Sequence, residues 1–151
     1  MIRTLLKWCG AAVLVAAYIH IAMHWSILPD EVPRHYNALG EPDAWAGKWF
    51  IFFAPTVGFV LWFLLGAIEK RPQFINMPGF QRDNPKHLAI SSVLSSVLRF
   101  EVALLFSYVS FKDVYIAQGM SFGLGSYELP VILGVLFGTV FFFMFRMLRS
   151  A

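Results

Sequence analysis

The sequence contains few charged residues and a single cysteine. Charged side chains make up 14% of the chain, whereas soluble domains carry roughly 25%. Because Cys9 is the only cysteine, an intrachain disulfide is excluded, and we expect a free buried thiol. No internal repeat or low-complexity tract divides the chain, so residues 1–151 are expected to form one domain. With 58% hydrophobic residues and a mean hydropathy of +0.64, that domain is expected in a membrane.

Four apolar runs are long enough to cross a bilayer, whose hydrocarbon core of about 30 Å needs roughly 20 helical residues. The expected spans are residues 8–28, 49–68, 88–111 and 129–145. The third is expected to belong to one long helix from Pro85 to about residue 118, because Asn84 can cap it and proline suits the first helical position. The sequence therefore predicts an all-α, four-helix membrane bundle with an ordered outer loop between the first two helices.

The distribution of lysine and arginine predicts how the bundle crosses the membrane, since short cytoplasmic loops carry the excess of basic residues. The basic residues at the termini and between the second and third spans are Arg3, Lys7, Lys70, Arg71, Arg82, Lys86, Arg146 and Arg149. Acidic residues outnumber basic ones in the other two loops. Both termini are therefore expected in the cytoplasm. Topology accounts for the basic residues, and no nucleic-acid partner is expected.

The first outer loop gathers polar residues in the stretch PRHYNALGEPD, residues 33–43. Pro33 and Pro42 restrain the residues before them to extended conformations, and Gly40 can adopt a positive φ. Asn37 is expected to cap or turn the backbone. Asp43 is a candidate N-cap of the second helix. His35 is expected either to bond the backbone or to join a ligand site.

A metal site is one interpretation of the histidines. His20 and His24 are four residues apart at the outer end of the first helix, so both rings lie on one face. With His35 and Asp43 on the same side of the membrane, the set would suit Zn or Cu. The alternative is that the pair bonds a neighbouring helix or faces water. Ile21 stands where the zinc-protease helix signature requires a catalytic glutamate, which excludes that signature.

Two charged residues, Arg99 and Glu101, interrupt the third span. Ionisable groups inside a membrane are costly and often functional. Two residues apart on a helix, they point to different faces, so each needs a partner on another helix, a lipid headgroup or water. We expect Arg99 to reach the phosphates of the inner leaflet, and Glu101 to meet a basic residue of a neighbouring helix or subunit.

Small residues mark two surfaces for close helix packing. Gly134 and Gly138 form a G-x-x-x-G motif in the fourth span. A second surface on the third span consists of Ser91, Ser92, Ser95 and Ser96. Packing within the bundle is expected for both, with contacts between subunits as the alternative.

The segment LPDEVPRHYNALGEPDAWAGKW, residues 28–49, resembles the signature of SdpI-like bacterial membrane proteins, a domain of unknown function. The matching positions are Leu28, Pro29, Val32, Pro33, His35, Tyr36, Asn37, Gly40, Glu41, Pro42, Asp43 and Lys48. Asn76, Pro78 and Asn84 stand where that family carries an Asn-x-Pro and a later Asn in the inner loop. Residues 1–151 do not include the G-x-R-T-type segment of longer SdpI-like proteins.

The resemblance implies a multi-pass protein of the bacterial inner membrane, with immunity against a secreted toxic peptide and signalling through a sequestered repressor as the known roles. The sequence favours a binding protein whose outer loop recognises an extracytoplasmic peptide or partner. One alternative is a metal-binding protein or enzyme with an outer-face site. Another is an accessory subunit of a larger membrane complex or a homo-oligomer. No catalytic residue and no certain cofactor is assigned.

The predicted topology can be tested by labelling single cysteines in a Cys9→Ser background. A membrane-impermeant maleimide should label Ala38→Cys in intact cells, because residue 38 lies in the expected outer loop. Ser150→Cys should react only after the cells are permeabilised. Labelling of Ser150→Cys in intact cells would reverse the predicted orientation.

Overall fold

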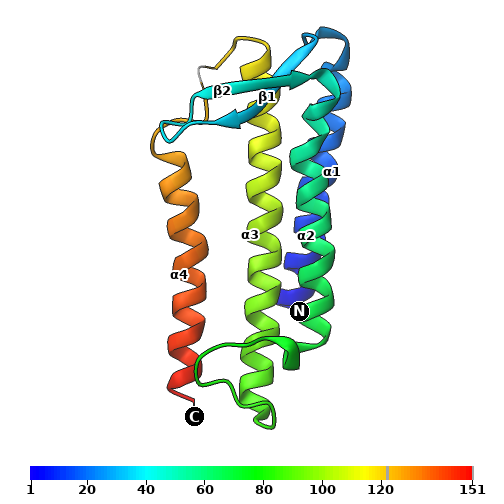
Figure 1. Ribbon diagram of the computed structural model, residues 1–151. Coiled ribbons are helices and arrows are strands. Elements are labelled where there is room, and N and C mark those ends of the chain that lie inside the picture. Colours follow the sequence, from blue (N-terminus) through cyan, green and yellow to red (C-terminus); the bar gives the residue numbers. More distant parts are fainter. Residues whose placement is uncertain (122, 151) are drawn as a thin grey trace.

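The computed structural model describes residues 1–121 and 123–150. Four long helices run side by side, with the two termini toward the same end of the bundle (Figure 1). They are α1 (Ile2–His24), α2 (Phe53–Lys70), α3 (Pro85–Ala117) and α4 (Glu128–Leu148). All four are long and apolar enough to cross a membrane, which confirms the four predicted spans.

The connection between α1 and α2 is a β-hairpin rather than the expected loop. β1 (Glu31–Tyr36) pairs antiparallel with β2 (Pro42–Gly47), and the hairpin lies across one end of the bundle (Figure 1). Proline inside a strand argues against a strand unless it stands at an edge or a bulge. Here Pro33 adjoins a register shift between Pro33 and His35. Residues 31–47 are called the outer hairpin below.

Short 3₁₀ helices complete the connections. The segments η1 (Trp25–Ile27) and η2 (Lys48–Phe52) join the outer hairpin to α1 and α2, and η3 (Pro72–Phe74) follows α2. In the inner loop that precedes α3, Asn76 and Pro78 are exposed.

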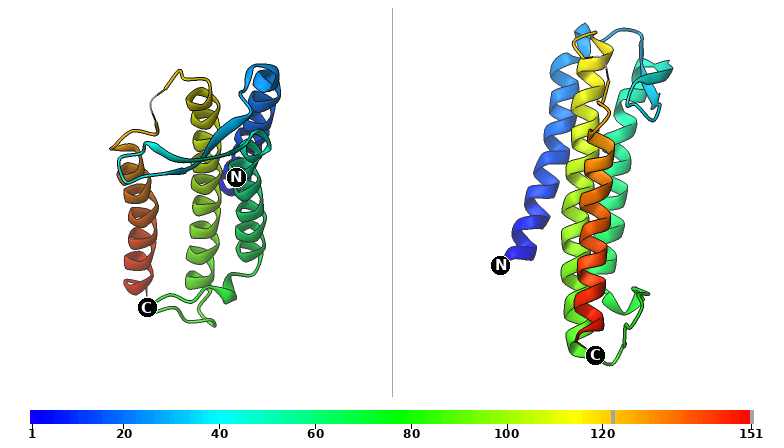
Figure 2. Two further views of the ribbon diagram at one scale, coloured as in Figure 1. Left: turned by 45° about the horizontal axis from the view of Figure 1, so that its top comes forward. Right: turned by 90° about the vertical axis from the view of Figure 1, so that its left-hand side faces the viewer.

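The central helix of the bundle is α3. Its N-terminus has the predicted cap: Asn84 Oδ1 accepts the Lys86 backbone N–H at 2.9 Å, and Pro85 is the first helical residue. In the most apolar 18-residue stretch of each helix, 44% of α3 is buried, against 11% of α4. The helix α4 is therefore peripheral and packs against α3, while α1 and α2 pack on the other faces of α3 (Figure 2).

Apolar side chains fill the bundle in three clusters at different depths. The outer cluster consists of Ile21, Leu28, Val32, Ile51 and Val114. The middle cluster consists of Leu14, Trp62 and Ala103. The inner cluster, between α3 and α4, consists of Ile90, Leu94, Phe143 and Met147. The outer cluster includes Val32 of β1, so the hairpin shares the core of the helices.

Small residues allow close approach on one predicted surface and not on the other. The serines of α3 at positions 91, 92, 95 and 96 are buried, as expected of a packing face. A Cβ added at Gly134 or Gly138 would have no neighbour within 4 Å, so the predicted packing of this motif within the bundle is wrong. Cys9 is exposed rather than buried.

Three helices approach one another closely at Gly58 in α2. A Cβ there would lie 2.7 Å from Leu14 Cδ2 on α1 and 2.7 Å from Phe106 Cβ on α3. The backbone of α2 therefore sits against both neighbours only because this position has no side chain.

Gly58→Ala should destabilise the purified protein by about 1–3 kcal/mol, because the added methyl group overpacks the contact of three helices. Gly134→Ala is the matched control. It places the same methyl group in open space and should cause no loss, since alanine favours helix over glycine by about 1 kcal/mol. Thermal unfolding in detergent measures both; equal melting temperatures for the two variants would contradict the packing at Gly58.

Candidate functional site

The turn of the outer hairpin is held by Asn37. Its Oδ1 atom accepts the backbone N–H groups of Leu39 at 2.9 Å and Glu41 at 3.0 Å, and its Nδ2 atom donates to Glu41 Oε2 at 3.0 Å. Gly40 has a φ of +77°, which residues with a side chain rarely adopt. The predicted turn role of Asn37 and the positive φ of Gly40 are both confirmed.

The outer hairpin is tied to the helices and to the α3–α4 loop. Val32 is fully buried in the outer cluster. The Tyr36 hydroxyl donates a hydrogen bond to Asp113 Oδ1 of α3. At the tip, the Leu124 backbone N–H donates to Gly40 O at 2.7 Å, where a Cβ on Gly40 would clash with the Gly125 backbone. The hairpin is therefore held at its base, middle and tip.

Two polar side chains of the hairpin are exposed and paired with each other. His35 Nδ1 and Asp43 Oδ1 lie 2.6 Å apart across the strands, with 68% and 42% of their side chains exposed. The prediction of Asp43 as an N-cap is wrong, because Asp43 lies in β2 and α2 begins only at Phe53. His35 pairs with Ala44, the residue next to Asp43, and its ring bonds the Asp43 carboxylate rather than the backbone.

Other residues of the hairpin are also exposed. Arg34, Leu39, Glu41 and Trp45 are exposed on the same hairpin. Lys48, the last residue of the matched motif, has its backbone N–H bonded to Asp30 O at 2.8 Å. Its ammonium lies 4.6 Å from the Trp25 ring. Lys48 therefore joins the end of the hairpin to an aromatic cluster that includes Trp25 and Trp49.

The candidate metal ligands lie in two separate pairs. The rings of His20 and His24 are 4.2 Å apart between centroids, and His20 packs 4.4 Å from Phe111 of α3. His24 Nδ1 lies 2.9 Å from His20 O. His35 and Asp43 form the second pair on the hairpin. Across residues 1–121 and 123–150, no group of three or more His, Cys, Asp or Glu side chains is placed to hold a metal.

Arg99 is buried between helices rather than extended to phosphates. Its Nη1 lies 3.4 Å from Glu69 Oε2 of α2, and its guanidinium stacks 3.6 Å from the centroid of the Trp62 ring. Glu69 also receives two N–H bonds from Arg3 of α1, at 2.8 and 3.0 Å. The expected contact of Arg99 with inner-leaflet phosphates is wrong in this structure, because the end of α2 supplies a nearer carboxylate.

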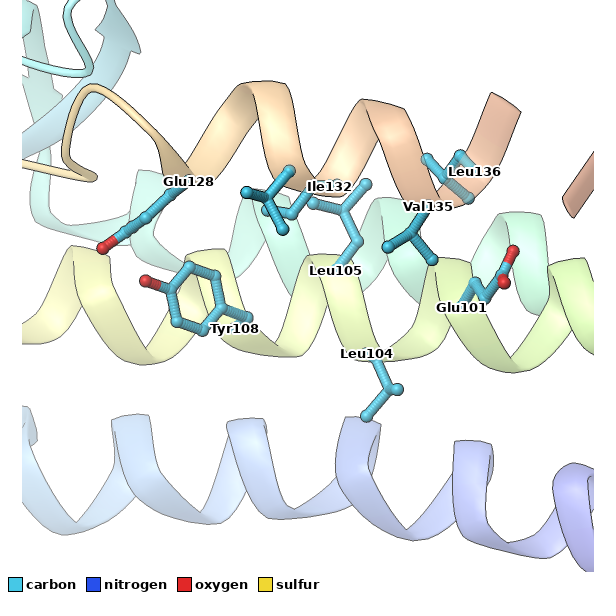
Figure 3. Close-up of a pocket in the computed structure, with 9 residues that line it drawn as sticks. Glu101, Leu104, Leu105, Tyr108, Glu128, Ile132, Val135 and Leu136 are labelled. Carbon is cyan, nitrogen blue, oxygen red and sulfur yellow. The ribbon is translucent and has the colours of Figure 1, made fainter. Parts of the chain in front are cut away.

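Glu101 meets the neighbouring helix α4, but the expected basic partner is wrong, because its partner is a hydroxyl. Thr139 Oγ1 donates to Glu101 Oε1 at 2.6 Å. Glu101 also lines a groove of about 320 Å³ between α3 and α4 (Figure 3). The walls are apolar, including Leu105, Ile132 and Val135, while Tyr108 and Glu128 lie at the other end. This groove was not visible in the sequence, because it forms between two helices far apart in the chain.

The Tyr36 contact generates a prediction for the anchoring of the hairpin. Tyr36→Phe should lower the free energy of unfolding by about 1.5–3 kcal/mol, the range for a hydrogen bond to a charged group. Tyr127→Phe is the control, because Tyr127 is 83% exposed. Thermal unfolding gives the stability, and hydrogen exchange of residues 31–47 should rise in Tyr36→Phe alone. Unchanged exchange would mean that the bond does not anchor the hairpin.

The same contact predicts a pH dependence. Burial, reinforced by the Asp113 carboxylate, raises the pKa of the Tyr36 phenol in the folded protein. In the unfolded chain the phenol ionises near pH 10. The stabilisation is therefore present below about pH 10 and is lost as the pH rises above it. The stability difference between wild type and Tyr36→Phe should therefore narrow as the pH rises above about 10.

Comparisons with known proteins find a similar region that includes the hairpin. A family model described as a domain of unknown function (DUF1648) matches residues 12–59, which run from α1 through the outer hairpin into α2. The chain is 34% identical over 86 residues to an uncharacterized protein of Archaeoglobus fulgidus, a match covering 47% of each protein. The chain thus spans about half of that relative. No solved structure matches the chain. The chain is a membrane-type helical protein that contains a region similar to DUF1648, consistent with the SdpI-like resemblance.

Proposed function

We propose that the protein binds a positively charged peptide, or a peptide segment of a partner protein, at the outer hairpin on the extracytoplasmic side of the membrane. The observation that carries this proposal is that some side chains of the hairpin bind the helices while others are exposed. Val32 and Tyr36 point to the helices and fasten it, whereas the paired His35 and Asp43 are exposed and fasten nothing to the bundle. A rigid surface loses little conformational entropy when a partner binds.

The charge of the surface indicates the class of partner. The segment from Leu28 to Lys48 contains four acidic residues, Asp30, Glu31, Glu41 and Asp43, and two basic residues, Arg34 and Lys48. Its formal charge is therefore −2 with histidine neutral. An acidic surface attracts cationic partners and repels anionic ones. Exposed Trp45 and Leu39 add the apolar contact that peptide recognition commonly uses.

The family resemblance supports a more specific role within this proposal. SdpI-like proteins protect a bacterial cell from a secreted peptide and signal to the cytoplasm. In this protein the outer hairpin would meet the peptide, and the basic inner loop, with Asn76, Pro78 and Asn84, would contact a cytoplasmic or membrane partner. This role includes a bacterial inner-membrane location with both termini in the cytoplasm. The DUF1648 match supports it by covering the hairpin, and it names no activity.

A second candidate function, that of a subunit in a larger membrane complex, is favoured by the surface of α4. Gly134 and Gly138 leave open space on a helix of which little is buried. Small-xxx-small faces suit close contact with another transmembrane helix. This candidate predicts co-purification with one partner at fixed stoichiometry, and a monomer in mild detergent would count against it. The geometry around His20, His24 and His35 gives a metal-dependent function no comparable support.

Photo-crosslinking in the native cell tests the peptide proposal. A photoreactive amino acid at exposed position 38, in the hairpin turn, should yield a discrete adduct with an extracytoplasmic peptide, identified by mass spectrometry. The same residue at position 137, on an exposed face of α4, is the control and should yield lipid adducts. Replacing His35 and Asp43 together with alanine should reduce the adduct at position 38 by about tenfold, since paired central groups dominate most interfaces.

The level and thermal stability of each variant must match the wild type, because only then does a lost adduct report on recognition. Position 38 yielding the same products as position 137 would contradict the proposal. For the immunity role, a strain lacking the gene should become sensitive to a peptide encoded beside it. Equal resistance of the two strains to every such peptide would exclude immunity and leave the binding proposal to the crosslinking result.

A further inference from the structure

A cluster of charged side chains lies at the end of the bundle opposite the hairpin. Arg3 of α1 and Arg99 of α3 both contact the carboxylate of Glu69 on α2, Arg3 through two N–H bonds and Arg99 at 3.4 Å. Arg3 Nε also lies 3.3 Å from Ser96 Oγ of α3. Three helices are therefore joined at one carboxylate.

The charges in this cluster do not balance. Two guanidinium groups share a single carboxylate, and Lys7 lines the same hollow. Arg3, Lys7 and Arg99 against Glu69 leave a formal charge of +2. The side chain of Arg99 is only 8% exposed, and its Nε atom is buried without a hydrogen-bond partner among the described residues. Excess positive charge beside a hydrocarbon region is costly unless an anion lies close to it.

A pocket opens beside these groups. It has a volume of about 230 Å³ and is lined by Met1, Arg3, Thr4, Lys7 and Glu69. It is called the basic pocket here. The side chain of Arg3 is 44% exposed, so its guanidinium is accessible, while the Glu69 side chain is only 12% exposed behind it. Glu69 engages Nε and Nη2 of Arg3, and among the described residues Nη1 makes no hydrogen bond, so Nη1 is available to a further group.

The depth of the pocket matches the headgroup boundary of a bilayer. Arg3 stands level with Ser96, and toward the hairpin end of α3 Lys112 lies 3.4 Å from Glu128. Sixteen residues separate Ser96 from Lys112, or roughly 24 Å of helix, somewhat less than the hydrocarbon core of about 30 Å. The N-terminal end of α1 stops short of the end of α3 at this side (Figure 2). The basic pocket is thus expected where lipid phosphates lie.

We propose that the basic pocket binds the phosphate group of an anionic phospholipid in the leaflet on the side of the two termini. The Nη1 group of Arg3 can donate a charge-assisted hydrogen bond to a phosphate oxygen, and Lys7 supplies a second cation. The neighbouring surface fits a lipid rather than a free ion, because Leu5 and Trp8 are 60% and 62% exposed and would lie along the acyl chains. Basic pockets at this depth bind anionic headgroups in other membrane proteins.

Native mass spectrometry of the detergent-purified protein tests this site. With added phosphatidylglycerol, the wild type should retain one lipid with an affinity at least about tenfold above that for phosphatidylcholine. The double variant Arg3→Gln/Lys7→Gln should lose this preference. The control Arg82→Gln/Arg149→Gln removes the same charge from exposed positions on the same side and should retain it.

Three results would overturn the proposal: equal retention by the wild type and the pocket variant, equal loss in the control variant, or displacement of the lipid by millimolar inorganic phosphate. The last would assign the pocket to a free anion. If Arg3→Gln/Lys7→Gln does not fold, Lys7→Gln alone keeps the bonds between Arg3 and Glu69 intact. That variant should bind phosphatidylglycerol at least about threefold more weakly than the wild type, and unchanged binding would again contradict the site.

Discussion

A bilayer core offers no water to satisfy polar groups, and this constraint shapes the contacts of the central helix. Along α3, four charged side chains meet partners on other elements: Arg99 meets Glu69, Glu101 meets Thr139, Lys112 meets Glu128, and Asp113 meets Tyr36. These contacts bind α2, α4 and the outer hairpin to α3, with two of the four contacts going to α4. The helix that carries most of the polar side chains is therefore also the one that positions the other helices and the hairpin.

The two ends of the bundle are built for different surroundings. At one end, the outer hairpin is fastened through Val32, Tyr36 and Gly40 and leaves His35 and Asp43 exposed. At the other end, Arg3 and Arg99 converge on Glu69 beside a basic pocket. A rigid acidic surface suits a soluble cationic partner, and a basic pocket at headgroup depth suits a phosphate. The same helices hold both, so a partner bound at the hairpin would act on a bundle that lipid fixes at its far end.

Local sequence signals predicted the features that depend on neighbouring residues. The apolar runs gave four helices, Asn84 and Pro85 began α3, and Asn37 and Gly40 formed a tight turn. The strands on either side of that turn were missed, because their two prolines argue against strands and the register shift that accommodates Pro33 is not visible in the sequence. Asp43 was predicted as a helix cap because a short polar residue before an apolar run is typical of an N-cap. The sequence does not distinguish that position from one in a strand.

By itself, the sequence determined the membrane environment, the number of helices and the polar character of the first connection, because hydrophobicity, caps and turns act over a few neighbouring residues. Only the tertiary structure decided the partners: Glu69 for Arg99, Thr139 for Glu101, Asp113 for Tyr36, and open space for Gly134 and Gly138. Such pairs lie about 30 to 80 residues apart in the chain. Their contact depends on which helix faces are turned toward each other, a property of packing that no local pattern encodes.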